Sequence, residues 1–280
     1  MLVTMVLLSL IVLSLMAVFN STQNAFRASL TQTDVLESGR LAMSLMTSDL
    51  EGMSPSSGTN YGYGANFYAN TNFGYLPLIQ SLTASSQLRT NLLQSFFSLS
   101  RQNIGGSPNW VGTGYTVISN SPDGTLYPLY RFYMTASANN GTPETLLSNF
   151  VYAVSFNTFT TNTTNWSHLM DGVVDLQVRV YDPYGFLMTN NYDLYNGQFI
   201  INQNTFITNQ NTICLFSNTI PASVEVELGV MEDAILTRAE GLPNVAPVYA
   251  QTAYLSNHVG QVHLFRQRVL VRNVDLTAYQ

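Results

Sequence analysis

Three aspartates in the middle of the chain are the first candidates for a functional site, because carboxylates can hold a metal ion. Asp171, Asp175 and Asp182 lie close together in the sequence, and calcium prefers clustered carboxylate oxygens. Asp171 and Asp175 share the parity of a strand and would point to one face. No loop of alternating acidic ligands surrounds them, so the calcium pattern is incomplete, and no other cofactor is indicated.

Histidine and serine residues do not form a catalytic pattern. His168, His258 and His263 are far apart, and none belongs to a ligand pattern such as His-Glu-x-x-His. Ser107 follows two glycines but lacks the spacing of a nucleophile elbow. Pro108 also removes the backbone N–H that would follow Ser107. We expect no catalytic residue and no enzymatic activity.

Composition makes nucleic acid an unsuitable partner. Only 9% of the 280 residues are charged, the net charge is -6, and all ten basic residues are arginines. Phosphate binding needs clustered lysine and arginine, and this chain has no such cluster. A sparsely charged surface of this kind suits subunits that pack side by side. Cys214 is the single cysteine, so an intrachain disulfide is impossible.

Asn-x-Ser/Thr triplets are acceptors of sugar where the machinery exists. They begin at Asn20, Asn140, Asn162 and Asn165. Such triplets also arise by chance in a sequence rich in asparagine and threonine. Glycosylation therefore stays open, with Asn140, Asn162 and Asn165 as the candidates.

The elements that must position any site begin with one apolar run, from Met1 to Phe19. As a helix this run would be about 28 Å long, close to the hydrocarbon thickness of a bilayer. It lacks the basic start of a signal peptide and is too long for one, and a buried core helix would show a polar face. We therefore favour a permanent anchor. Its apolar residues are Met1, Leu2, Val3, Met5, Val6, Leu7, Leu8, Leu10, Ile11, Val12, Leu13, Leu15, Met16, Val18 and Phe19.

The helix is expected to continue to about residue 50 as a stalk, because 20–50 contains no proline and a single internal glycine, Gly39. Apolar residues fall on two opposite arcs at 100° per residue. We expect one arc to pack on the chain's own head and the other on neighbouring subunits. Glu37 and Arg40 are three apart and can pair along the helix. The expected stalk contacts are Phe26, Leu30, Glu37, Arg40, Leu41 and Leu45.

Residues 51–280 are expected to form one β-rich head. In the strand predicted at 223–230, Val and Leu alternate with Glu225 and Glu227, which predicts one buried and one wet face. A loop is expected over 52–74 and a short helix over 76–99, ended by the glycines of 105–114. The predicted fold class is α+β, a long N-terminal helix packed on an antiparallel sheet domain. Strands are predicted at 126–134, 151–156, 173–181, 198–201, 212–216, 223–230 and 262–272.

Several stretches resemble one family, the type IV pilins and the pseudopilins of type II secretion. Met1 to Phe19 resembles the N-terminal helix of that family directly after its glutamate, and neither this glutamate nor the family's leader is among the 280 residues. Residues 36–46 are similar to the second half of that helix in large minor pilins and in the J-type minor pseudopilin. Residues 170–182 and 220–228 resemble two strands of the J-type protein. The resemblance covers 1–50 and about 170–272.

The resemblance implies a structural subunit of an extracellular pilus or a periplasm-spanning pseudopilus. Its partners would be copies of itself or other pilin-like subunits, and it would stay in the bacterial inner membrane before assembly. Residues 1–19 would form the filament core, 20–50 the stalk and 51–280 the head. The alternative is a membrane-anchored binding or hydrolytic domain that never polymerises.

Overall fold

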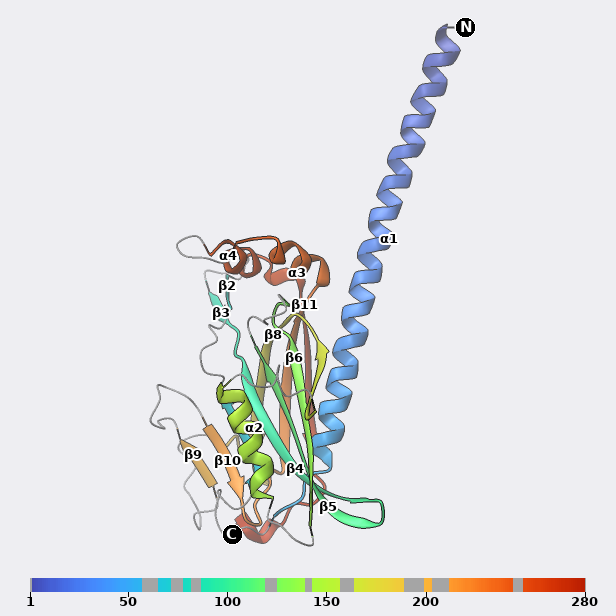
Figure 1. Cartoon of the computed structure of the whole chain (residues 1–280). Helices are drawn as coiled ribbons and strands as arrows, with labels where there is room; N and C mark the ends of the chain where they lie inside the picture. Colours follow the sequence, from blue (N-terminus) through green and yellow to red (C-terminus); the bar gives the residue numbers. More distant parts are fainter. Residues whose placement is uncertain are drawn as a thin grey trace.

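The computed structural model describes residues 2–56, 65–71, 78–81, 87–118, 125–138, 143–156, 164–188, 199–202, 212–243 and 249–279. The architecture is α+β: a long N-terminal helix lies beside a head of antiparallel sheets and extends far beyond it (Figure 1). The predicted fold class is confirmed at this level, a long helix followed by antiparallel sheet.

Helix α1 (Leu2–Glu51) is continuous over 50 residues, which confirms the predicted helix through residue 50. No proline interrupts it, so each N–H can reach the carbonyl four residues earlier. Its C-terminal half packs on the head through buried Val35, Ala42, Met46 and Leu50. These four residues are the arc that the sequence places opposite Phe26, so the head covers one predicted side of the stalk.

The larger sheet has seven strands in the order β7-β6-β5-β4-β1-β10-β9, and every neighbouring pair is antiparallel. Helix α2 (Glu144–Phe156) covers one face of this sheet over an aromatic cluster that includes Phe97, Phe132, Phe150 and Trp166. The strands are β1 (Ala65–Thr71), β4 (Gln94–Ile104), β5 (Ser107–Val117), β6 (Leu129–Ser137), β7 (Trp166–Met170), β9 (Phe199–Asn202) and β10 (Thr212–Phe216).

The smaller sheet has the order β12-β11-β8 and carries the contact with the long helix. Its strands are β8 (Val173–Tyr181), β11 (Ser223–Met231) and β12 (Val262–Leu270). Val224, Val226 and Leu228 point into the core that α1 and both sheets share. An isolated bridge between Leu93 and Leu176 joins the two sheets.

Short elements complete the head. Strands β2 (Ile79–Ser81) and β3 (Leu88–Thr90) form a hairpin. Helices α3 (Asp233–Glu240) and α4 (Ala250–Ser256) close the end of the head beside which α1 leaves it (Figure 1). Two 3₁₀ turns, η3 (Val259–Gln261) and η4 (Leu276–Tyr279), flank β12 and end the described chain.

The predicted helix over 76–99 is wrong, because β2, β3 and the start of β4 occupy its described residues. Its helix-like spacing has a physical cause. Phe96 stacks on Tyr115 in the core beneath α1, with ring centroids 5.0 Å apart, whereas Phe97 packs on Phe150 of α2, with centroids 5.6 Å apart. A strand buried on both faces loses the alternation that identifies a half-buried strand.

Three further predictions need correction. The loop predicted over 52–74 contains strand β1 among its described residues. The strand predicted at 151–156 is the second half of α2, whose buried Leu146, Phe150 and Ala153 follow a helical spacing. The glycines of 105–114 do not end a helix. Gly105 and Gly106, both at positive φ, form the turn of the β4–β5 hairpin. The strands predicted at 173–181 and 212–216 are confirmed to the residue.

Candidate functional site

The N-terminal half of α1 is an exposed apolar rod. The segment Thr4–Phe26 is long and apolar enough to cross a membrane by length and composition, and none of it is buried against the head. It is a candidate membrane anchor or signal sequence. Ser9 and Thr22 donate their hydroxyls to the carbonyls of Val6 and Val18, at 2.8 and 2.9 Å, so these polar groups need no outside partner.

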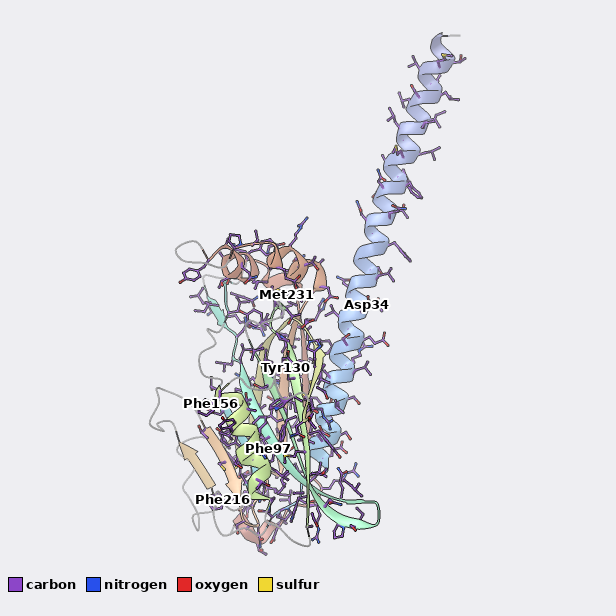
Figure 2. The ribbon with its side chains drawn as sticks, viewed as in Figure 1. Asp34, Phe97, Tyr130, Phe156, Phe216 and Met231 are labelled. Carbon is purple, nitrogen blue, oxygen red and sulfur yellow. The ribbon has the colours of Figure 1, made fainter. Side chains whose placement is uncertain are left out.

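The predicted anchor residues all lie on this rod where the structure describes them (Figure 2). Leu8 is 68% exposed and Leu13 is 67% exposed. Met1 lies outside the described residues, and so do the side chains of Leu2 and Val3. The exposed side chains are Met5, Val6, Leu7, Leu8, Leu10, Ile11, Val12, Leu13, Leu15, Met16, Val18 and Phe19.

An outward stripe, defined as Phe26, Leu30, Glu37 and Leu41, continues this surface along the stalk. At 3.6 residues per turn the four lie within about 60° of one another around the helix axis. Phe26 and Leu41 are each 65% exposed, so they do not pack on the head. Of the six expected stalk contacts only Leu45 packs partly against the head core. In the monomer no described part of the head covers the outward stripe.

Glu37 and Arg40 do not form the expected pair. Both side chains are exposed, and neither is in an ion pair within the described part of the chain. They line a common open hollow of about 500 Å³ on the outer side of α1. These two charges have no ion-pair partner among the described residues, whereas the Thr33 hydroxyl in the same hollow donates to the Ser29 carbonyl.

A partly buried polar cluster fixes the lower end of α1 to the larger sheet. Asp49 accepts two hydrogen bonds from the Arg131 guanidinium, each at 3.0 Å, and one from the Tyr115 hydroxyl at 2.6 Å. Burial, reinforced by the Asp49 carboxylate, raises the pKa of Tyr115 far above its usual value. A bidentate pair of this kind sets orientation as well as distance. No local sequence pattern predicts this cluster, because its members are distant in sequence.

An open groove of about 270 Å³, which we call the α1–β12 groove, lies between the stalk and the edge strand of the smaller sheet. Phe265 of β12 reaches across to Gly39, where an added Cβ would lie 2.3 Å from the ring. Glycine is therefore required for this close approach. The groove is lined by Arg40, Met43, Ser44, Thr47, Phe265, Arg266 and Gln267.

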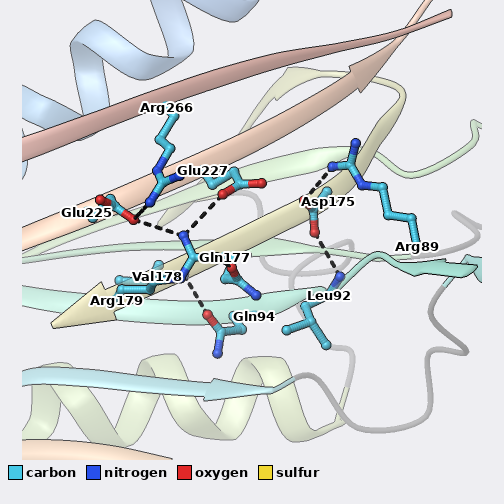
Figure 3. Close-up of polar contacts among 10 residues, drawn as sticks. All are labelled: Arg89, Leu92, Gln94, Asp175, Gln177, Val178, Arg179, Glu225, Glu227 and Arg266. Atoms are coloured by element: carbon cyan, nitrogen blue, oxygen red, sulfur yellow. Dashed lines mark hydrogen bonds and ion pairs between the residues drawn. The ribbon is translucent and has the colours of Figure 1, made fainter. Parts of the chain in front are cut away.

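The outer face of the smaller sheet carries a charged ladder (Figure 3). Arg179 contacts Glu225 at 2.8 Å and Glu227 at 3.1 Å, and Arg266 contacts Glu225 at 2.7 Å. Burial opposes ionisation of Glu225, but the guanidiniums of Arg266 and Arg179 outweigh it and hold the pKa of Glu225 below its usual value. The face predicted to be wet is largely buried, because Glu225 is only 8% exposed, and cross-strand ion pairs satisfy its charge.

The three calcium candidates occupy separate environments. Asp175 is buried and accepts from Arg89 at 3.0 Å and from the Leu92 amide at 2.8 Å (Figure 3). Asp171 lies 2.9 Å from His168, and Asp182 accepts from the Phe186 amide at 2.7 Å beyond the other end of β8. Within the described residues no group of three or more His, Cys, Asp or Glu is placed to hold a metal.

The histidines and the lone cysteine have structural surroundings. His263 lies 3.1 Å from Glu232, and His258 lies 2.6 Å from the Tyr254 carbonyl. Burial raises the pKa of the Cys214 thiol to about 12, so it stays protonated at neutral pH. Ser107 is exposed at the start of β5. These residues do not converge on one another in the described structure.

The structure describes the surroundings of one of the three glycosylation candidates. Asn140 and Asn162 lie outside the described residues, and Asn165 is half-buried just before β7. Comparison of the chain with models of protein families, with curated proteins and with solved structures finds no match. The features of the described structure that bear on function are therefore the exposed helix, the outward stripe and the α1–β12 groove.

Proposed function

We propose that the chain is a structural subunit of a helical filament, similar to a type IV pilin or a type II secretion pseudopilin. The observation that carries the proposal is the division of α1 into two halves. The lower half is fixed to the head by Met46, Leu50 and the Asp49 cluster, and the upper half is apolar and makes no contact with the head. A filament subunit needs this division, because the upper half of α1 must be free to contact neighbouring subunits while the lower half stays fixed to its own head.

The physical basis is a transfer between two apolar environments. Before assembly the segment Thr4–Phe26 would lie in the bacterial inner membrane, where a charge-free helix of this length is stable. In the filament the same surface would contact the helices of other subunits. Lipid and subunit contacts are comparably apolar, so the transfer costs little hydrophobic free energy, and packing between helices can drive it.

The outward stripe supports polymerisation over simple anchoring. A monomeric anchored domain would expose Phe26, Leu30 and Leu41 to water outside the membrane segment or at its edge, and such exposed large side chains gain from a protein partner. The head would face outward in the filament and make lateral contacts. Its partners would be copies of this chain or other pilin-like subunits.

Fractionation of cells that express the chain tests the proposal. Filaments sheared from the cell surface, or pseudopili induced by overexpression, are collected by sedimentation and probed with an antibody to the head. We expect the chain in the sedimented fraction. Full retention of the chain in detergent-extracted membranes, with none in sheared filaments, would instead support the non-polymerising anchored domain.

A further inference from the structure

Two charged side chains on the stalk have no ion pair among the described residues. Most described arginines in the head have carboxylate partners, as in the pairs Arg89–Asp175, Arg131–Asp49 and Arg272–Glu51. Arg40 and Glu37 are exposed and have none among the described residues. They lie one helical turn apart on the surface that the head leaves uncovered.

The α1–β12 groove has the chemistry of a carboxylate site. Arg40 stands on its helix wall, and Met43 and Phe265 supply apolar surface beside it. Arg266 also borders the groove, but its side chain points to the opposite face of β12 from Phe265 and contacts Glu225 there. Arg40 is therefore the guanidinium of the groove that has no carboxylate partner among the described residues, and an exposed arginine beside apolar surface suits a carboxylate on a short aliphatic stem.

The chain itself offers such a carboxylate next to the groove. Glu37 stands in the outward stripe between Leu30 and Leu41, both of them exposed and apolar. Three residues separate Glu37 from Arg40, which is about 4.5 Å of helix rise. A parallel neighbour that is shifted along the helix axis by about this distance brings its Glu37 level with Arg40. The length of the two side chains allows a somewhat larger shift.

We propose that the α1–β12 groove binds Glu37 of a second, axially shifted copy of the chain. This inference rests on the proposed function, and it names the contact by which one subunit would align the next. Each copy presents one carboxylate and one groove at different places, so the contact is head-to-tail and can repeat without closing. Leu30 and Leu41 are exposed on the same stripe as Glu37 and would border the contact.

A mixing experiment with charge-reversed copies tests the contact. Glu37→Arg places two positive residues at the contact between identical copies, and Arg40→Glu places two negative residues there. We expect each variant alone to yield about tenfold less sedimentable filament than the wild type, equivalent to about 1.4 kcal/mol. When the two variants are expressed together, each contact between unlike copies again joins opposite charges, so filament yield recovers.

The recovery on mixing separates this contact from a pair within one helix. If Glu37 and Arg40 instead paired within one helix, each variant alone would show the same loss of filament yield. Mixing the two variants would not restore the yield, because each helix would still carry two like charges. Wild-type filaments without recovery on mixing would overturn the inference and leave the proposed function standing. A wild type that forms no filament at all would overturn both.

A cross-link supplies an independent readout. Copies with Glu37→Cys are mixed with copies with Arg40→Cys, and mild oxidation should give an interchain disulfide dimer on a non-reducing gel. The native Cys214 is buried and does not compete. Copies with Tyr152→Cys, an exposed position on α2 far from the stalk, are the matched control for Glu37→Cys. Equal dimer yield from the control mixture would contradict the proposed contact.

Discussion

At the scale of single residues, Asp49 is the polar group that fixes the stalk to the head. Asp49→Asn removes the negative charge that faces the half-buried Arg131, so we expect the free energy of unfolding to fall by about 3 kcal/mol. Tyr115→Phe removes only the hydroxyl that donates to Asp49 and should cost about 1.5 kcal/mol. Urea denaturation of the detergent-solubilised chain measures both changes.

Asp34→Asn is the matched control for Asp49→Asn. Asp34 is exposed on the same helix and has no ion pair among the described residues. We expect its substitution to change the unfolding free energy by less than about 0.5 kcal/mol. Similar denaturation midpoints for the two variants would show that the Asp49 cluster does not fix the helix.

Asp175 should make the stability of the head depend on pH. Burial, with Glu227 adding to it, raises the pKa of Asp175 although the Leu92 amide and Arg89 oppose the shift. The native pKa then exceeds the unfolded pKa, so the native chain binds more protons, and the contribution of Asp175 to stability declines as pH rises through its native pKa. Asp175→Asn keeps an acceptor for the Leu92 amide and removes this titration.

The measurement for Asp175 is the unfolding free energy of the wild type minus that of Asp175→Asn, taken between about pH 4 and pH 7, where carboxyl groups with raised pKa values titrate. We expect this difference to become less favourable to the wild type as pH rises. If the difference instead grew in favour of the wild type as pH rises, the ion pair with Arg89, and not burial, would determine the direction of the pKa shift of Asp175.

At the scale of elements, Gly39 sets how closely α1 approaches β12. Gly39→Ala should gain about 1 kcal/mol of helix propensity, but its Cβ would overlap the Phe265 ring, and overpacking costs about 1–3 kcal/mol. We expect a net loss of stability in the wild type. In a Phe265→Leu background the ring is absent, so Gly39→Ala should become neutral or stabilising.

A double-mutant cycle of these two substitutions measures the coupling. Gly52→Ala is the control, because an added Cβ there has its nearest neighbour at 3.8 Å. If the effects of Gly39→Ala and Phe265→Leu on the free energy of unfolding were additive, α1 would not pack against the Phe265 ring at Gly39.

The same elements show how far local pattern predicts the structure. The alternation in 173–181 and the uninterrupted run to residue 50 predict β8 and α1 because each depends on near neighbours in sequence. Only residues 94–99 of β4 fall in the segment predicted as helix, and the pattern misleads there because Phe96 and Phe97 are covered on opposite faces by distant elements. The Asp49 cluster joins residues separated by 66 and 82 positions, and no local periodicity reports such a partner.

The candidate site follows the same division. The exposed apolar rod and the two arcs of the stalk follow from helical spacing alone. The position of β12 decides which arc the head covers and whether a groove forms beside Arg40. The sequence pattern therefore does not predict the groove. The calcium pattern fails for a related reason, because Asp171 and Asp182 lie beyond opposite ends of β8 and each has its own partner.

At the scale of the whole molecule, the chain is a head with a helix that is half fixed and half free (Figure 1). The smaller sheet holds the stalk, the larger sheet anchors its lower end, and α3 and α4 lie where the free half begins. This arrangement keeps the outward stripe at a constant position relative to the head. In the proposed filament each subunit would therefore present the outward stripe at the same place.

The most direct test of polymerisation through the exposed helix is the distribution of a Leu41→Glu variant between sheared filaments and membranes. Leu41 is 65% exposed and lies beyond the segment Thr4–Phe26, so the monomer should fold and remain anchored. Leu276→Glu, at an exposed leucine on the head, is the control. We predict that Leu41→Glu leaves the filament fraction and accumulates in membranes, whereas Leu276→Glu behaves as the wild type. Equal recovery of both variants in filaments would contradict the account.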